Sequence, residues 1–104
     1  MPISATTTHR YEKLTWPDIN DAVELGQVCV VPCGAVEQHG PHLPLDVDLV
    51  CPTGVANGAG SQMPDKMKVL PVVSYGYTGH VMDFPGTING HYEHFINYTL
   101  DVVK

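Results

Sequence analysis

The chain has 104 residues, enough for one small domain, and a formal net charge of −6. The lack of any Lys or Arg cluster argues against nucleic acid or an anionic membrane surface as partner, and no apolar run is long enough to span a membrane. The amino terminus lacks the basic-then-apolar order of a signal peptide, so we expect a cytoplasmic protein whose three cysteines are reduced.

Residues 1–13 are polar, include a threonine run, and are expected to form a flexible lead. A helix is predicted to follow, because Thr15 can act as N-cap, Pro17 suits the first turn and Asp18 lies three residues after the cap. One face of this helix is apolar and consists of Ile19, Ala22 and Val23. Gly26 is expected to end the helix.

Residues 27–31 are a short, β-branched apolar run between Gly26 and Pro32, which predicts a buried strand of a parallel sheet. Cys29 lies inside this run and is expected to pack as a small apolar residue. The chain then leaves the sheet through Pro32 and Gly34. The side chains that follow should therefore lie at the carboxyl end of the strand, where open α/β sheets bind their ligands.

Acidic residues and histidines are crowded into residues 34–48. Glu37 and His39 are two apart, so both side chains point to the same side of an extended segment. A loop shaped by glycine and proline can then return the chain to Asp48. Carboxylate and imidazole donors suit Zn²⁺, Mn²⁺ or Fe²⁺. Cys33 lies beside this group and could act as a nucleophile, but we do not favour that role because no cysteine-hydrolase signature surrounds it.

A structural explanation of two of these acids stays open. Residues 49–60 are predicted to form a helix, which tolerates Pro52 if that residue lies in the first turn. Asp46 and Asp48 at the amino terminus of such a helix would be stabilised by its dipole. We assign Asp46 this role, and Asp48 either this role or that of a metal ligand.

Residues 68–73 are predicted to form a second buried strand, in which Pro71 indicates an edge or a bulge. Residues 75–79 leave the carboxyl end of this strand just as the acidic segment leaves the first, so both loops should rim one crevice. His80 and Asp83 lie on that rim. They could contact a substrate or a metal ion, but we favour their interpretation as solvated residues at the tip of a loop.

Two strings of residues resemble one known family, in the same order. Residues 37–44, which read EQHGPHLP and are followed by Asp48, resemble the metal-binding signature of the creatininase (creatinine amidohydrolase) family. Residues 75–77 (YGY) and 83–87 (DFPGT) resemble its tyrosine-glycine and phenylalanine-proline-glycine-threonine segments. The chain is less than half the length of the family's domain.

The resemblance implies a metal-dependent amidohydrolase with a three-layer α/β/α sandwich, a mainly parallel sheet and two divalent ions, Zn and/or Mn with Fe possible. It implies that Glu37 ligates one ion, His39 the other and Asp48 both, while Gln38 and His42 either support the ligands or shape the loop. The implied substrate is a small cyclic amide or formamide, cleaved at a C–N bond that is not a peptide bond. The resemblance also implies a homo-oligomer at full length, and a general-base histidine beyond the end of this chain.

The last part of the chain has two interpretations. Residues 89–93, NGHYE, resemble a later motif of the family, so His91 and Glu93 could complete a compact metal site. Alternatively, the chain continues in family order into a helix that starts at these two residues. The apolar face of that helix would consist of Phe95, Ile96, Leu100 and Val103. We favour the second interpretation, in which residues 14–104 are the truncated amino-terminal part of one domain and are inactive alone.

A third hypothesis concerns another class of protein. Two strands and three helices leave sheet edges unpaired, which favours association unless a partner chain covers them. The chain would then be a small metal-binding or scaffolding module without catalysis.

Overall fold

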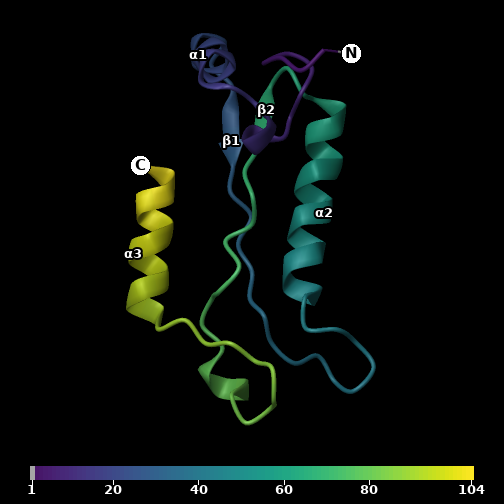
Figure 1. Ribbon diagram of the computed structural model, residues 1–104, viewed down its shortest axis with the longest axis vertical. Helices are drawn as coiled ribbons and strands as arrows, with labels where there is room; N and C mark the ends of the chain where they lie inside the picture. The colour runs from purple at the N-terminus through teal and green to yellow at the C-terminus, as the bar shows by residue number, and fades with distance from the viewer. Residues whose placement is uncertain (1) are drawn as a thin grey trace. The chain divides into compact units, whose positions relative to one another are not determined.

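The computed structural model describes residues 2–104 (Figure 1). In chain order its elements are the 3₁₀ turn η1, Tyr11–Lys13; helix α1, Trp16–Glu24; strand β1, Val28–Val30; helix α2, Val47–Gln62; strand β2, Met67–Val69; the 3₁₀ turn η2, Gly79–Val81; and helix α3, Tyr92–Val103. No helix in this described part of the chain is both long and apolar enough to cross a membrane.

The chain divides into two compact units, each built from two stretches of sequence. Unit 1 consists of Met1–Pro32 and Thr53–Pro71 and contains α1, both strands and most of α2. Unit 2 consists of Cys33–Pro52 and Val72–Lys104 and contains the start of α2, η2 and α3. All three predicted metal ligands belong to unit 2.

Strands β1 and β2 are parallel, as predicted, with Val28 opposite Met67 and Val30 opposite Val69. Parallel strands need a long crossover connection, and here that connection contains helix α2. Buried side chains of α2 and β2 form the core of unit 1, which consists of Ala56, Met67 and Val69. Unit 1 is therefore organised as strand, helix and parallel strand.

Strand β1 is more exposed than the sequence predicts. Val28 is 64% exposed, and Cys29 is exposed rather than packed as a small apolar residue. The prediction assumed that other elements cover both faces of a parallel strand. Within residues 2–104, β1 pairs only with β2, so its second edge is open. Strand β2 meets the expectation, since all three of its residues are buried.

Helix α1 begins with the predicted cap. The backbone N–H and the hydroxyl of Thr15 donate to Asp18 Oδ2 at 3.0 and 2.9 Å, and Gly26 follows the end of the helix with φ of +67°. On the predicted apolar face Ala22 is buried, but Val23 is 72% exposed. The cap depends on neighbours in sequence, whereas burial of a face depends on what packs against it.

Helix α2 is two residues longer at each end than predicted. It begins at Val47, so Pro52 lies beyond the first turn. The prediction required this proline to lie within the first turn. Proline has no N–H, so Pro52 cannot donate the usual helical bond to the carbonyl of Asp48. The helix start is held instead by the carbonyl of Asp46, which accepts two backbone N–H bonds at 2.9 Å.

Residues 2–13, predicted as part of a flexible lead, contact the rest of unit 1. Ala5 is 4% exposed, and its carbonyl accepts bonds from Gln27 Nε2 and Lys68 Nζ, both at 2.8 Å. The backbone of Arg10 also bridges to β2. Composition does not reveal these contacts, because they use main-chain groups. The domain boundary expected after this segment stays a prediction.

The segments that follow β1 and β2 are hydrogen-bonded to each other in unit 2. The N–H of Gly34 donates to the carbonyl of Val73 at 2.8 Å, and the N–H of Gly76 donates to the carbonyl of Gly34 at 3.1 Å. Strand β2 ends before Pro71, and pairing resumes at Val73. The second predicted strand is therefore interrupted at its proline, which cannot donate to a sheet.

Helix α3 forms where the favoured interpretation predicts a C-terminal helix. His91 is its N-cap, and His91 Nδ1 accepts a bond from the Glu93 N–H at 3.3 Å. None of the residues of α3 is buried, including those of its apolar face. The helix is amphipathic in sequence, yet no part of the described chain buries its apolar side.

Candidate metal centre

Glu37, His39 and Asp48 converge in the structure. One possible ligand atom from each lies within 4.8 Å of the other two, so the three side chains can surround one ion. Within residues 2–104 no other group of three or more His, Cys, Asp or Glu side chains has this spacing. All three residues are half-buried. An ion at this point would be partly desolvated and still reachable from solvent.

The local backbone explains the convergence. Glu37 and His39 lie in a segment that is neither helix nor strand, and the N–H of Glu37 donates to the carbonyl of Leu45 at 3.3 Å, which closes the loop. Gly40 turns the chain with φ of +79°, a conformation that residues with a side chain disfavour. Asp48 then falls in the first turn of α2.

Glu37 is in an environment that disfavours its negative charge. Burial raises the pKa of its carboxyl most. A side-chain hydrogen bond with Asp48 and the charge of Asp48 raise this pKa further, while His80 and His39 lower it less. The Oε2 atom of Glu37 is buried and has no hydrogen-bond partner. A bound cation would satisfy such an oxygen and balance the two neighbouring carboxylates, so the residues present fit a divalent ion.

The imidazole of His39 is oriented by its own segment. Its Nδ1 lies 3.1 Å from the carbonyl oxygen of Glu37, and because a carbonyl can only accept, Nδ1 carries the proton of this bond. In the neutral ring Nε2 then has a free lone pair, and it lies 3.5 Å from Asp48 Oδ2. Metal-binding histidines commonly donate their other ring N–H to an acceptor in this way.

Several other residues singled out from the sequence lie outside this group. Gln38 shapes the loop as expected, since its Oε1 accepts a backbone N–H two residues on at 2.9 Å. His42 is exposed, and the main chain of Asp46 helps to start α2. His80 is exposed in η2, which agrees with its interpretation as a solvated residue, and its charge lowers the pKa of Glu37.

The structure does not bring His91 and Glu93 into the metal group. Both are exposed, and the bond between them is that of residues which start a helix. Their interpretation as surface residues therefore fits the structure better than their interpretation as ligands. Asp83 is likewise exposed, and Cys33 is exposed next to its backbone bridge with Val73.

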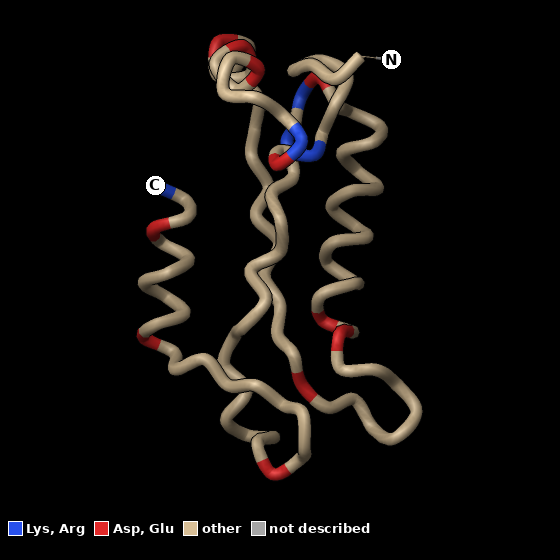
Figure 2. Tube along the Cα trace, viewed as in Figure 1, with Lys and Arg blue, Asp and Glu red and all other residues tan. Residues whose placement is uncertain are grey.

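Unit 2 has most of the net negative charge of the chain. It contains six of the 11 Asp and Glu residues but, of the five Lys and Arg residues, only Lys104. In Figure 2, red segments mark the loop before α2 and the start of that helix, whereas blue segments gather around β2 and the N-terminal segment. An environment of one sign attracts ions of the other, so unit 2 favours cations.

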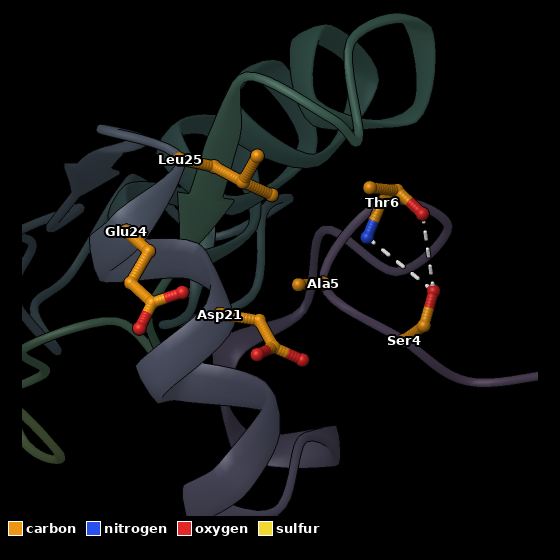
Figure 3. Close-up of a pocket in the computed structure, with 6 residues that line it drawn as sticks. All are labelled: Ser4, Ala5, Thr6, Asp21, Glu24 and Leu25. Carbon is orange, nitrogen blue, oxygen red and sulfur yellow. Dashed lines mark hydrogen bonds between the residues drawn. The ribbon is translucent and has the colours of Figure 1, made fainter.

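A separate hollow lies in unit 1, between the N-terminal segment and α1 (Figure 3). Its volume is about 460 Å³, and its lining consists of Ser4, Ala5, Thr6, Asp21, Glu24 and Leu25. The hydroxyls of Ser4 and Thr6 lie 3.3 Å apart and hydrogen-bond to each other. The hollow shares no residue with the metal group and is not part of that centre.

Comparison with known proteins gives one consistent relationship. The sequence profile of the family Creatininase, described as creatinine amidohydrolase, matches residues 12–104. The mycofactocin precursor peptide peptidase of Mycobacterium ulcerans (strain Agy99) is 33% identical over 91 residues, which are 81% of this chain and 32% of that protein. The creatinine amidohydrolase of Pseudomonas putida is 36% identical over 81 residues, which are 72% of this chain and 30% of that protein.

A solved structure named Creatininase Mn superposes with a TM-score of 0.84 at 29% identity, over 92% of this chain and 39% of that one. The predicted α/β fold class is therefore confirmed. The chain spans about a third of the length of the curated relatives that it matches. Because the family profile covers nearly all of its residues, this chain belongs to the creatininase family.

Proposed function

We propose that this chain supplies metal ligands to an amidohydrolase centre of the creatininase type. Glu37, His39 and Asp48 would hold a divalent ion, and the convergence of their side chains within 4.8 Å is the observation that carries the proposal. Carboxylate and imidazole donors are those that Zn²⁺ takes in proteins, and Mn²⁺ also accepts them.

The proposed reaction is the addition of water to an amide carbonyl, followed by cleavage of the C–N bond. The two relatives are named for an amidohydrolase that acts on creatinine and for a peptidase that acts on a precursor peptide. Because one of them is named a peptidase, the expected restriction to bonds other than peptide bonds stays a prediction. A small cyclic amide or a formamide is the substrate class that we propose to test first.

When bound, a divalent ion activates water as a nucleophile and polarises the amide carbonyl. The contribution of the chain is the arrangement of its donors. His39 presents Nε2 because its Nδ1 donates to the carbonyl of Glu37. Glu37 presents a buried carboxylate oxygen that has no other partner. Asp48 lies beside both, with Oδ2 at 3.5 Å from His39 Nε2.

The resemblance to the family implies a second ion, in which case Glu37 would hold one ion, His39 the other, and Asp48 would serve both. Three ligand residues are too few to fill the coordination of two ions. Further ligands must therefore come from outside this group, and no residue of the chain is assigned as general base. The stoichiometry of an ion titration measures how many ions the chain holds.

Calorimetric titration with Zn²⁺ or Mn²⁺ tests the centre. The native chain is expected to bind the ion, and His39→Ala is expected to weaken binding at least about tenfold. His42→Ala is the matched control, because His42 is exposed on the same loop and lies outside the group. A native chain that binds neither ion would refute the proposal, and so would equal ion affinities of the two variants.

A metal-binding module without catalysis is the second candidate function. The observation that favours it is the open edge of β1, where Val28 is 64% exposed and available to a partner chain. If size-exclusion chromatography shows a folded monomer, the open edge of β1 no longer supports a partner chain. Hydrolysis of creatinine by the ion-loaded chain would exclude the module in favour of an enzyme.

A further inference from the structure

Residues 87–90 form a short segment, here called the strap, that joins two loops of unit 2. The first loop, residues 36–38, contains Glu37, and the second is residues 76–78. Thr87, the first residue of the strap, also ends the second string that resembles the creatininase family. The proposed reaction assigns no role to the strap, although Thr87 is a polar residue that is only 8% exposed.

Two hydrogen bonds connect the strap to the first loop. The N–H of Ile88 donates to the carbonyl of Val36 at 2.9 Å. The N–H of Gln38 donates to Thr87 Oγ1 at 3.1 Å. These bonds lie on the two sides of Glu37, and the N–H of Glu37 itself donates to the carbonyl of Leu45. The backbone around this carboxylate is therefore held on both sides.

Three hydrogen bonds connect the strap to the second loop. Thr78 is fully buried; its hydroxyl donates to the carbonyl of Ile88 at 2.6 Å, and its N–H donates to Asn89 Oδ1 at 2.8 Å. The N–H of Gly90 donates to the carbonyl of Gly76 at 3.0 Å. Ile88 thus donates to one loop and accepts from the other, so the strap fixes the two loops against each other.

We propose that Thr87 is a positioning residue for Glu37 in the metal centre, an inference that rests on the proposed function. Thr87 acts through the backbone of Gln38, because its hydroxyl supplies the acceptor that this N–H requires. Groups that orient a ligand in this way strongly affect the affinity for the metal. Without the hydroxyl, the backbone on one side of Glu37 loses its fixed position and the carboxylate is no longer held toward His39 and Asp48.

Two substitutions at Thr87 separate the hydroxyl from the size of the side chain. Thr87→Val keeps the size and removes the acceptor, and it is expected to weaken Zn²⁺ binding about tenfold in a calorimetric titration. Thr87→Ser keeps the acceptor and is expected to bind Zn²⁺ like the native chain. Thr99→Val is the matched control: Oγ1 of Thr99 is buried in α3 without a hydrogen-bond partner, so the same change should leave Zn²⁺ affinity unaltered.

Amide hydrogen exchange adds a measurement that does not need the ion. The Gln38 amide should exchange slowly in the native chain and in Thr87→Ser, and faster in Thr87→Val. If Thr87→Val does not fold, as judged by circular dichroism, Thr87→Ala makes the same comparison. Equal Zn²⁺ affinity of Thr87→Val and the native chain overturns the inference, as does weak binding by Thr87→Ser. Failure of the native chain to bind Zn²⁺ is a different result, which overturns the proposed function and the positioning role together.

Discussion

The carbonyl oxygen of Asp48 occupies the space that a side chain on Gly34 would need. A Cβ atom added to Gly34 would overlap that oxygen and lie 2.9 Å from the carbonyl carbon. Both obstructing atoms belong to the main chain and cannot rotate away. A residue without a side chain at position 34 therefore allows the start of α2 to lie against the loop that follows β1. It thereby also allows the carboxylate of Asp48 to reach the metal group.

Gly34→Ala is expected to destabilise the ion-free chain by about 1–3 kcal/mol, as overpacking does, and to weaken Zn²⁺ binding because Asp48 must move. Urea unfolding measures the stability and calorimetry the affinity. Gly58→Ala is the control. Gly58 lies in α2, the helix that contains Asp48, and a Cβ atom added to it would meet nothing within 4 Å. It should stabilise the chain by about 0.5–1 kcal/mol without changing Zn²⁺ affinity. Gly34→Ala with native Zn²⁺ affinity would contradict the proposed role of Asp48.

Glu37→Gln is expected to stabilise the ion-free chain at pH 7 while it weakens ion binding. The pKa of the Glu37 carboxyl is raised above its ordinary value of 4.5, by burial first and then by Asp48. Folding therefore favours the protonated form, and the stability that Glu37 contributes below pH 4.5 is lost as the pH rises through its folded pKa. Glutamine does not ionise, so the stability of Glu37→Gln is not lowered in this way as the pH rises.

Thermal unfolding without metal checks this prediction: the midpoint of Glu37→Gln should exceed that of the native chain at pH 7, and the difference should shrink toward pH 4. With excess Zn²⁺ at pH 7 the order should reverse, because the ion stabilises the folded native chain. Identical midpoints of the two ion-free chains at pH 7 would show that burial and Asp48 do not oppose the charge of Glu37.

Asp18→Asn is expected to show the opposite dependence on pH. The carboxylate of Asp18 accepts the backbone N–H and then the hydroxyl of Thr15, and both bonds lower its pKa from 3.8. The stability that it contributes is therefore present above pH 3.8 and lost as the pH falls through the lower folded pKa. The thermal midpoint of Asp18→Asn should lie below that of the native chain at pH 7, and the two midpoints should converge as the pH falls below 3.8. Asp21→Asn, an exposed change on the same helix that leaves the Thr15–Asp18 bonds in place, is the control and should have the native thermal midpoint at pH 7.

His91→Ala tests whether the chain forms a compact metal centre. It is expected to leave Zn²⁺ affinity unchanged, because His91 caps α3 and lies outside the metal group. Loss of its bond to the Glu93 N–H should destabilise the helix by about 0.5 kcal/mol, the low end for a cap. His94→Ala removes a neighbouring exposed imidazole and serves as the control. Weaker Zn²⁺ binding in His91→Ala alone would support the interpretation in which His91 completes the site.

Features that depend on neighbours in sequence could be predicted from the sequence. The start of α1 follows from the spacing of Thr15 and Asp18, whose side chain and backbone bond to each other. The convergence of Glu37 and His39 agrees with their separation by two in a segment that was predicted to be extended. The parallel pairing of the two strands follows from a connection long enough to contain a helix.

Features that depend on distant neighbours could not be predicted. The exposure of Val28 reflects which elements cover β1, and a pattern of apolar residues does not contain that information. The contact of Thr87 with the Gln38 N–H joins residues 49 positions apart and involves a main-chain donor that every sequence has. The string of residues 83–87 was the one signal that pointed toward Thr87. The influence of His80 on Glu37 likewise depends on the path of a loop.

Every residue of β2 is buried, whereas no residue of α3 is. This difference predicts that α3 unfolds locally before β2 does. A helix of 12 residues is marginal in water when it relies on its own backbone bonds, whereas β2 opens only when the core of unit 1 is lost. Under mild denaturant the amides of α3 should therefore exchange first and proteases should cut there first, while those of β2 report global unfolding.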